Sequence, residues 1–148
     1  MDLTGLLTIN GLDAYSTYNA FLAELNEADH SNMDELRRVS KSKSYSPVSF
    51  REENGEKLPA VLNAKLEPAD RSLQFCLFGA TETELNSKYT SFMTAITSGW
   101  LTMIVKDLRT YKLYYQEQSS ITWYDHFAPD DPFVCVVKIK FREPEPTI

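Results

Sequence analysis

The segment from Thr81 to Gly99 constrains the fold more than any other part of the sequence, because it has the pattern of an amphipathic helix. Thr81 and Glu84 form an S/T-x-x-E capping box, which satisfies free amides at a helix start. Gly99 closes the segment with a residue that favours a helix end. The apolar residues lie on one helical face: Leu85, Tyr89, Phe92, Met93 and Ile96. Such a face must be buried, so we predict a helix of about residues 81–98 packed on a sheet.

Most of the remaining pattern is typical of strands. The clearest strand segments are 71–79, 100–106, 110–116 and 133–142. In the first, Leu73, Phe75 and Leu77 alternate with smaller or polar residues, which is the period of a half-buried strand. The last segment would bury Phe133, Cys135, Val137, Ile139 and Phe141. We therefore predict a mainly β (α+β) fold, an antiparallel β-sandwich or partial barrel with the helix on a sheet.

Several shorter segments carry weaker signals. Residues 6–9 favour a strand, residues 12–18 a short helical turn followed by an extended stretch, and residues 32–38 one more turn of helix. Asn10-Gly11 is interpreted as a strand end and redirecting turn and not as a tight hairpin turn, because the flanking segments are short or not cleanly alternating.

Two longer segments complete the chain. Asn54-Gly55 is the stronger hairpin signal, with strands expected near 47–52 and 58–66. Residues 118–132 are interpreted as a long polar loop, a length that is more often functional than passive.

Length and composition indicate one domain over residues 1–142, followed by an extended Pro- and Glu-rich tail at 143–148. A net charge of −6 argues against specific nucleic-acid binding, which needs a clustered basic surface. The sequence contains neither an apolar run long enough to span a membrane nor the pattern of a signal peptide. We expect no membrane contact, and we expect the chain to stay in the cytoplasm where it is made. Cys76 and Cys135 lie in apolar runs and are expected to be buried, reduced thiols.

The residues give little support for catalysis, cofactors or metals. The sequence lacks the nucleophile-elbow, phosphate-loop, dinucleotide and zinc-protease motifs. One acidic segment, with Asp125, His126, Asp130 and Asp131, is a weak candidate for a metal site, and a solvated loop explains it equally simply. We expect no enzyme activity and no cofactor.

Aromatic residues favour an interaction surface instead. Trp123, Tyr124, Phe127 and Tyr114 lie close together in the chain, and Tyr and Trp are enriched at protein interfaces. We interpret these four as interface candidates. For Tyr111 and Tyr115, core and interface remain equally good interpretations.

The order of motifs along nearly the whole chain resembles the N-terminal domain of phage distal tail proteins, the hub of siphophage baseplates, and related small prophage tail proteins. The resemblance begins with I-N-G-x-D-A at residues 9–14, followed by Tyr15 and Tyr18. Phe50 to Gly55 then matches an aromatic-R-E-E-N-G stretch. Further matches are Arg71, Leu73 and Phe75 in a strand, Tyr89, Phe92 and Gly99 in the helix, the tyrosine strand 111–115, and Phe141, Glu143 and Pro144 at the end. Asn19 departs from the pattern, because the family often has Gly there.

The resemblance implies a β-sandwich with a helix that assembles through its edges into a homo-oligomeric ring, commonly a hexamer, around the tail channel. The expected location is the virion tail, at the distal hub or in the tube, with other tail proteins as partners. Ring closure needs a protruding element and a receptive surface. The candidates are residues 40–66, with Phe50 and Arg51, and residues 118–132. An acidic chain also fits the wall of a channel for DNA, because a negative lumen would not bind the passing genome. The alternative is a small bacterial β-sandwich adaptor or ligand-binding module without catalysis.

Overall fold

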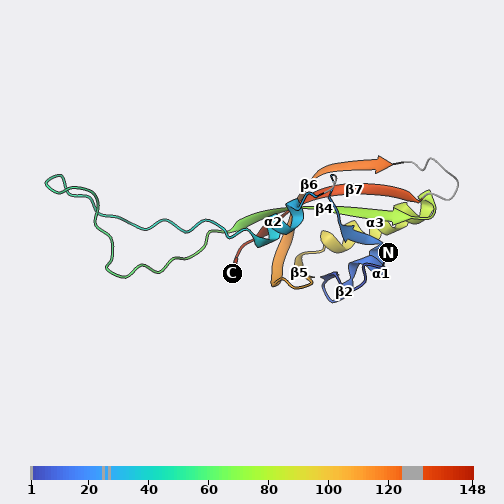
Figure 1. Cartoon of the computed structure of the whole chain (residues 1–148), viewed down its shortest axis with the longest axis horizontal. Coiled ribbons are helices and arrows are strands. Elements are labelled where there is room, and N and C mark those ends of the chain that lie inside the picture. The colour runs from blue at the N-terminus through green and yellow to red at the C-terminus, as the bar shows by residue number, and fades with distance from the viewer. Residues whose placement is uncertain (1, 25, 27, 125–131) are drawn as a thin grey trace.

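The computed structural model describes residues 2–24, 26, 28–124 and 132–148. Its strands form one antiparallel sheet in the order β2-β1-β5-β6-β7-β4-β3 (Figure 1). The strands are β1 (Leu7–Ile9), β2 (Leu12–Asp13), β3 (Ala20–Leu22), β4 (Ala69–Gly79), β5 (Trp100–Val105), β6 (Thr110–Tyr124) and β7 (Phe133–Glu143). The helices are α1 (Ala14–Tyr18), α2 (Ser31–Arg37) and α3 (Glu82–Ile96). The predicted class is confirmed: the fold is mainly β, with one substantial helix on an open sheet.

The core lies between the inward face of β4 and β7, the helices, and the layer formed by β1, β5 and the start of β6. Phe75 of β4 contacts Phe92 of α3 edge-on, with ring centroids 5.3 Å apart, and lies beside Phe141 of β7. Such edge-to-face pairs add about 0.5–1.5 kcal/mol beyond the area they bury. The predicted inward faces are confirmed for Leu73, Phe75, Leu77, Cys135, Val137, Ile139 and Phe141, which are all buried, whereas Phe133 is half-buried and packs against the core.

Helix α3 begins as its sequence indicates. The Thr81 hydroxyl accepts a hydrogen bond from the Glu84 amide, and the Glu84 carboxylate accepts one from the amide of Ala80, one residue before the expected partner. The helix ends at Ile96, capped by Thr97, so Gly99 lies further from its end than expected. Gly99 instead supplies a φ of +131° where the chain turns into β5.

The prediction for Asn10-Gly11 was wrong. Ile9 pairs with Leu12 in an antiparallel register, and Asn10 and Gly11 have φ values of 51° and 83°, so the two residues form a tight hairpin turn between β1 and β2. The hairpin needs no long alternating strand because β5 supports it. The main-chain amide of Asn10 donates to the carbonyl of Thr102, and its side chain accepts from the Thr102 amide.

Beyond this hairpin, α1 and β3 confirm the expected helical turn and extended stretch. Asn19 caps α1 in the left-handed conformation with φ 52°. Asn is one of the few residues with a side chain that tolerates this region.

The interpretation of residues 118–132 as a loop was wrong for its first half. Strand β6 continues to Tyr124 and pairs with β7 as far as the Tyr124–Val134 pair. Strand β7 is long and apolar on one face, and Ile121 and Thr122 are good strand formers. Two irregularities in the β6–β7 register, between Tyr115 and Glu117 and between Gln118 and Ser120, interrupt the alternation that sequence reasoning relies on. Residues 125–131 lie outside the described residues.

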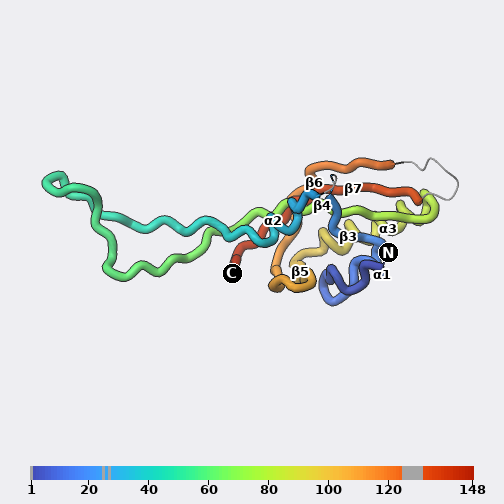
Figure 2. The backbone as a smooth tube through the Cα atoms, viewed as in Figure 1, coloured from blue at the N-terminus to red at the C-terminus, as the bar shows by residue number. Residues whose placement is uncertain are grey.

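Residues 40–66 are all described by the structure, and the two regular strands expected at 47–52 and 58–66 do not form there. Residues 40–66, which we call the arm, form two extended legs that project far from the body (Figures 1 and 2). Only two isolated bridges link the legs, Ser42–Leu66 and Val48–Lys57. A two-stranded ribbon with nothing packed on it is marginal in water, and Pro47 and Pro59 cannot donate to a ladder. The Asn54-Gly55 turn itself lies at the tip, with a Gly55 φ of +76°.

Candidate functional site

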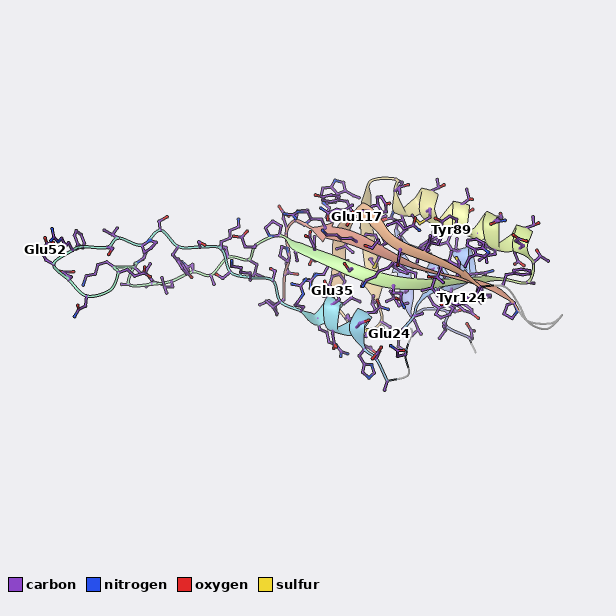
Figure 3. All side chains as sticks on the ribbon, turned by 90° about the horizontal axis from the view of Figure 1, so that it is seen from above. Glu24, Glu35, Glu52, Tyr89, Glu117 and Tyr124 are labelled. Carbon is purple, nitrogen blue, oxygen red and sulfur yellow. The ribbon has the colours of Figure 1, made fainter. Side chains whose placement is uncertain are left out.

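The predicted interface residues lie in three separate places. Phe50 and Arg51 are exposed near the tip of the arm. Tyr114 lies near the start of β6, and Trp123 and Tyr124 lie at its far end. Figure 3 shows Glu52 at the arm tip and Tyr124 at the opposite end of the molecule. Phe127 lies outside the described residues. The structure therefore does not gather these side chains into one patch.

Contacts within the chain distinguish the aromatic residues further. Trp123 is half-buried and packs edge-on against Tyr89 of α3, with ring centroids 6.0 Å apart, whereas Tyr124 is 45% exposed. Tyr111 is a core residue: it is buried, and its hydroxyl donates to the carbonyl of Leu36 at 2.6 Å. Tyr115 is half-buried and packs against the core.

Sequence reasoning missed an exposed aromatic patch beside Tyr114. Trp100, 57% exposed at the start of β5, contacts Tyr114 at 5.6 Å between ring centroids, and the Lys112 ammonium lies 4.7 Å from the indole centre. The signal was present, because the alternation of 100–105 places Trp100 on the face opposite the buried Leu101. Trp rings on an outer strand face are typical of contact surfaces.

A buried ion cluster of Arg71, Arg109 and Glu143 lies at the root of the arm, which is the place where the arm joins the body. The carboxylate of Glu143, the last residue of β7, accepts from Arg71 of β4 at 3.1 Å and from Arg109 at 2.6 Å. The side chains of Arg71 and Glu143 are only 1% and 2% exposed. The hydrogen bond to Glu143 raises the pKa of Arg109. One buried carboxylate therefore pairs with two guanidinium groups, of which Arg71 is buried and Arg109 is partly exposed.

The same cluster reaches the chain where the arm begins. Arg71 also donates to the main-chain carbonyls of Glu35 and Arg38, each at 2.6 Å, at the end of α2. Arg38 donates back to the carbonyl of Asp70 at 2.7 Å. Near the start of α2, the side-chain amide of Asn32 donates to the carbonyl of Gln74, and its side-chain oxygen accepts from the Gln74 amide. A neighbouring strand would make the same pair of bonds. These bonds tie α2, from whose end the first leg of the arm departs, to β4, into which the second leg runs.

The arm itself has the properties of a contact element. Its residues from 41 to 65 are all exposed except Tyr45, which is half-buried. Its exposed apolar side chains include Val48, Phe50, Leu58, Val61 and Leu62. Backbone hydrogen bonds join its legs to each other, as between Lys43 and Lys65, and one from the Glu53 amide to the Phe50 carbonyl closes a turn near the tip. Apolar side chains gathered on a projecting element are typical of binding surfaces.

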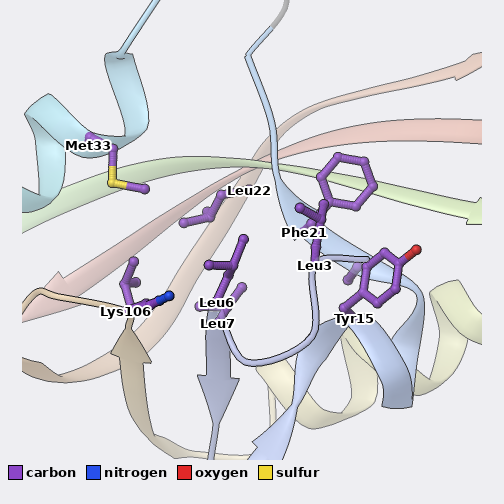
Figure 4. A pocket seen from close by; sticks show the side chains of 10 residues that line it. Leu3, Leu6, Leu7, Tyr15, Phe21, Leu22, Met33 and Lys106 are labelled. Atoms are coloured by element: carbon purple, nitrogen blue, oxygen red, sulfur yellow. The ribbon is translucent and has the colours of Figure 1, made fainter. Parts of the chain in front are cut away.

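An apolar groove lies on the body, between α1, β1, β3 and α2 (Figure 4). It has a volume of about 140 Å³ and is lined mainly by apolar side chains, including Leu3, Leu6, Tyr15, Phe21, Leu22 and Met33. Tyr15 and Phe21 belong to a cluster of three rings with Phe78, in which centroids are 5.6 to 6.4 Å apart. Among the described residues that line the groove, Lys106 is the one that carries a charge. The groove can accept an apolar or aromatic side chain.

The far half of β6 has an open edge. Strand β5 pairs with β6 only as far as Tyr114, so within the described residues no strand pairs with the outer side of 116–124. This stretch exposes Ile121 and Tyr124. An unpaired strand edge can bind another strand through its free amides and carbonyls.

The described residues contain no group of His, Cys, Asp or Glu that could hold a metal ion. The candidate cluster at 125–131 lies outside them. Cys76 and Cys135 are free and buried as predicted, and burial raises their pKa values to about 11 and about 12. Among the described residues, no helix is both long and apolar enough to cross a membrane.

Comparison with known proteins gives a structural relationship. A scan against protein-family models and a search of curated proteins both returned no match. The structure is similar to the crystal structure of SPP1 Dit (gp 19.1), described as a paradigm of the hub adsorption apparatus in phages infecting Gram-positive bacteria. The TM-score is 0.57 at 15% identity, over 95% of this chain and 50% of the other. The chain thus shares the fold of this protein and spans half of its length.

Proposed function

We propose that this chain is a structural protein of a phage or prophage tail, which forms a homo-oligomeric ring, a hexamer, at the distal hub or in the tube. The observation that carries the proposal is the shared fold with a phage hub protein over 95% of the chain. In the virion tail its partners would be further copies of itself and other tail proteins. Catalysis, cofactors and nucleic-acid recognition have no part in this role.

The surfaces of the chain support self-assembly. The arm projects at one end of the molecule, whereas the groove and the open edge of β6 lie on the body. When a protruding element of one copy meets a different surface of the next, the contact is head-to-tail, and repeated contacts close into a ring if the rotation permits.

The oligomeric state tests the proposal directly. Sedimentation velocity over a range of protein concentrations, followed by electron microscopy of any large species, should give a closed ring with one discrete mass. Strictly monomeric protein at high concentration would contradict it. That result would favour the alternative, a small adaptor or ligand-binding module, for which the apolar groove would be the binding site.

A further inference from the structure

We infer that the apolar groove is the receptor for the arm of a second copy, with Phe50 of that copy as the side chain that enters it. This inference rests on the proposed self-assembly and names its contact surfaces. The groove has the right size. A cavity of about 150 Å³ lined by aliphatic and aromatic side chains can hold a benzene molecule, and the groove measures about 140 Å³. One phenyl ring would therefore fill it.

Phe50 is the best-placed side chain to do so. It is the aromatic residue nearest the tip of the arm and is 52% exposed. The groove wall contains Tyr15 and Phe21, so an inserted ring would meet aromatic edges and faces as well as aliphatic side chains. Glu52 and Glu53 follow Phe50 closely and would lie within reach of Lys106, the charged residue of the groove lining.

Charge complementarity indicates a second copy as the occupant. The arm carries five Lys or Arg and three Glu, a net charge of +2, and the whole chain carries −6. The remainder of the chain therefore carries −8. An arm would be attracted by the body of another copy, and the bodies would repel each other unless an arm lay between them. Within one copy the arm points away from the body that bears the groove (Figures 1 and 3).

The root cluster gives the arm a defined direction. Arg71 holds the end of α2, where the arm leaves the body, and Arg38 holds β4, where it returns. An arm inserted between two segments that are held together loses less conformational freedom on docking than a free linker would. Every copy would thus present Phe50 at a similar place relative to its own groove, which a repeating head-to-tail contact requires.

Site-directed cross-linking tests the contact. Phe50→Cys protein is mixed with Leu6→Cys protein and oxidised under mild conditions. Leu6 is 41% exposed in the groove lining, so its replacement leaves the core intact. The rival mixture pairs Phe50→Cys with Ile121→Cys on the open edge of β6, where Ile121 is 46% exposed. The native thiols should contribute little background, because both are buried.

We expect a disulfide-linked dimer in the groove mixture and none in the rival mixture. A dimer only in the rival mixture would place the arm on β6 and overturn the inference. Phe50→Ala should weaken association at least about 30-fold, the effect of losing a 2 kcal/mol hot spot. Val61→Ala, the control on the same arm at 74% exposure, should change it little.

The two proposals fail differently. If the wild-type chain forms rings but Phe50→Ala assembles normally and the groove mixture yields no dimer, the groove inference is wrong and the ring remains. If the wild-type chain stays monomeric at every concentration, both proposals fall together.

Discussion

Replacing Glu143 by Gln should destabilise the domain severely, although the two side chains have nearly the same shape. The change removes the negative charge that matches Arg71 and Arg109, and Arg71 has no access to water, with 1% of its side chain exposed. Breaking a buried ion pair in this way costs about 3–5 kcal/mol. That is a large part of the roughly 5–15 kcal/mol by which a domain is stable. For a chain of this size the melting temperature should fall on the order of 10 °C.

Thermal and urea unfolding followed by circular dichroism would measure the loss. The matched control is Arg142→Gln, which breaks a 3.0 Å pair with Asp70 in which the side chains are 36% and 40% exposed. Such partly exposed pairs contribute about 0–1 kcal/mol. The reasoning fails if Glu143→Gln is no more destabilising than Arg142→Gln, because the charge of Arg71 would then be neutralised by some other means.

Arg71→Met separates the two roles of the cluster. It removes the donors to the carbonyls of Glu35 and Arg38 as well as the ion pair, whereas Glu143→Gln leaves those donors in place. Hydrogen exchange at the end of α2 and in the arm root should therefore accelerate more in Arg71→Met than in Glu143→Gln at equal global stability. Equal acceleration in both variants would mean that Arg71 does not fix the root through these carbonyls.

Three further predictions concern the core. Tyr111→Phe should cost about 1–3 kcal/mol in urea unfolding, because the carbonyl of Leu36 loses its buried donor. Gly79→Ala should lower the melting temperature, because an added Cβ would lie 2.7 Å from the amide nitrogen of Leu85 at the start of α3, an overpacking that costs about 1–3 kcal/mol. The Cys135 thiol, with its pKa raised to about 12 by burial, should resist alkylation at pH 8 in folded protein and react after unfolding. Since the folded state holds this proton more tightly than the unfolded state, its contribution to stability should be complete below about pH 9 and be lost as the pH rises toward 12.

The periodic elements were predictable because their partners lie in the same chain. Helix α3 and strands β4 and β7 bury the faces that their spacing indicates, since each packs against the other two. The far half of β6 was not predictable, because two register irregularities and several Ser, Thr and Gln residues hide the alternation of its apolar side chains. Its strand character comes from the neighbouring β7, which supplies the ladder.

The ion cluster was only partly predictable from the sequence. Arg71 precedes Leu73 by two residues and Glu143 follows Phe141 by two, so alternation places both charges on the inward face. A charged residue at such a position is normally attributed to the end of the strand. The observation that would have identified the pair is the register of β4 with β7, in which Ala69 opposes Glu143 and Arg71 opposes Phe141. That register is a property of the folded sheet.

The extended conformation of the arm could not be predicted from the sequence, for a different physical reason. Periodicity reports which residues are buried by their own molecule, and the arm leaves Val48, Phe50 and Val61 in water. Exposed apolar area of this kind favours association, because each side chain gains free energy when another surface covers it. The arm could also cover these side chains by folding back onto its own body. The buried cluster at the root opposes this, because folding back would have to break the bonds from Arg71 to α2. A rigid root and an apolar tip together favour a contact with another molecule over a contact within the chain.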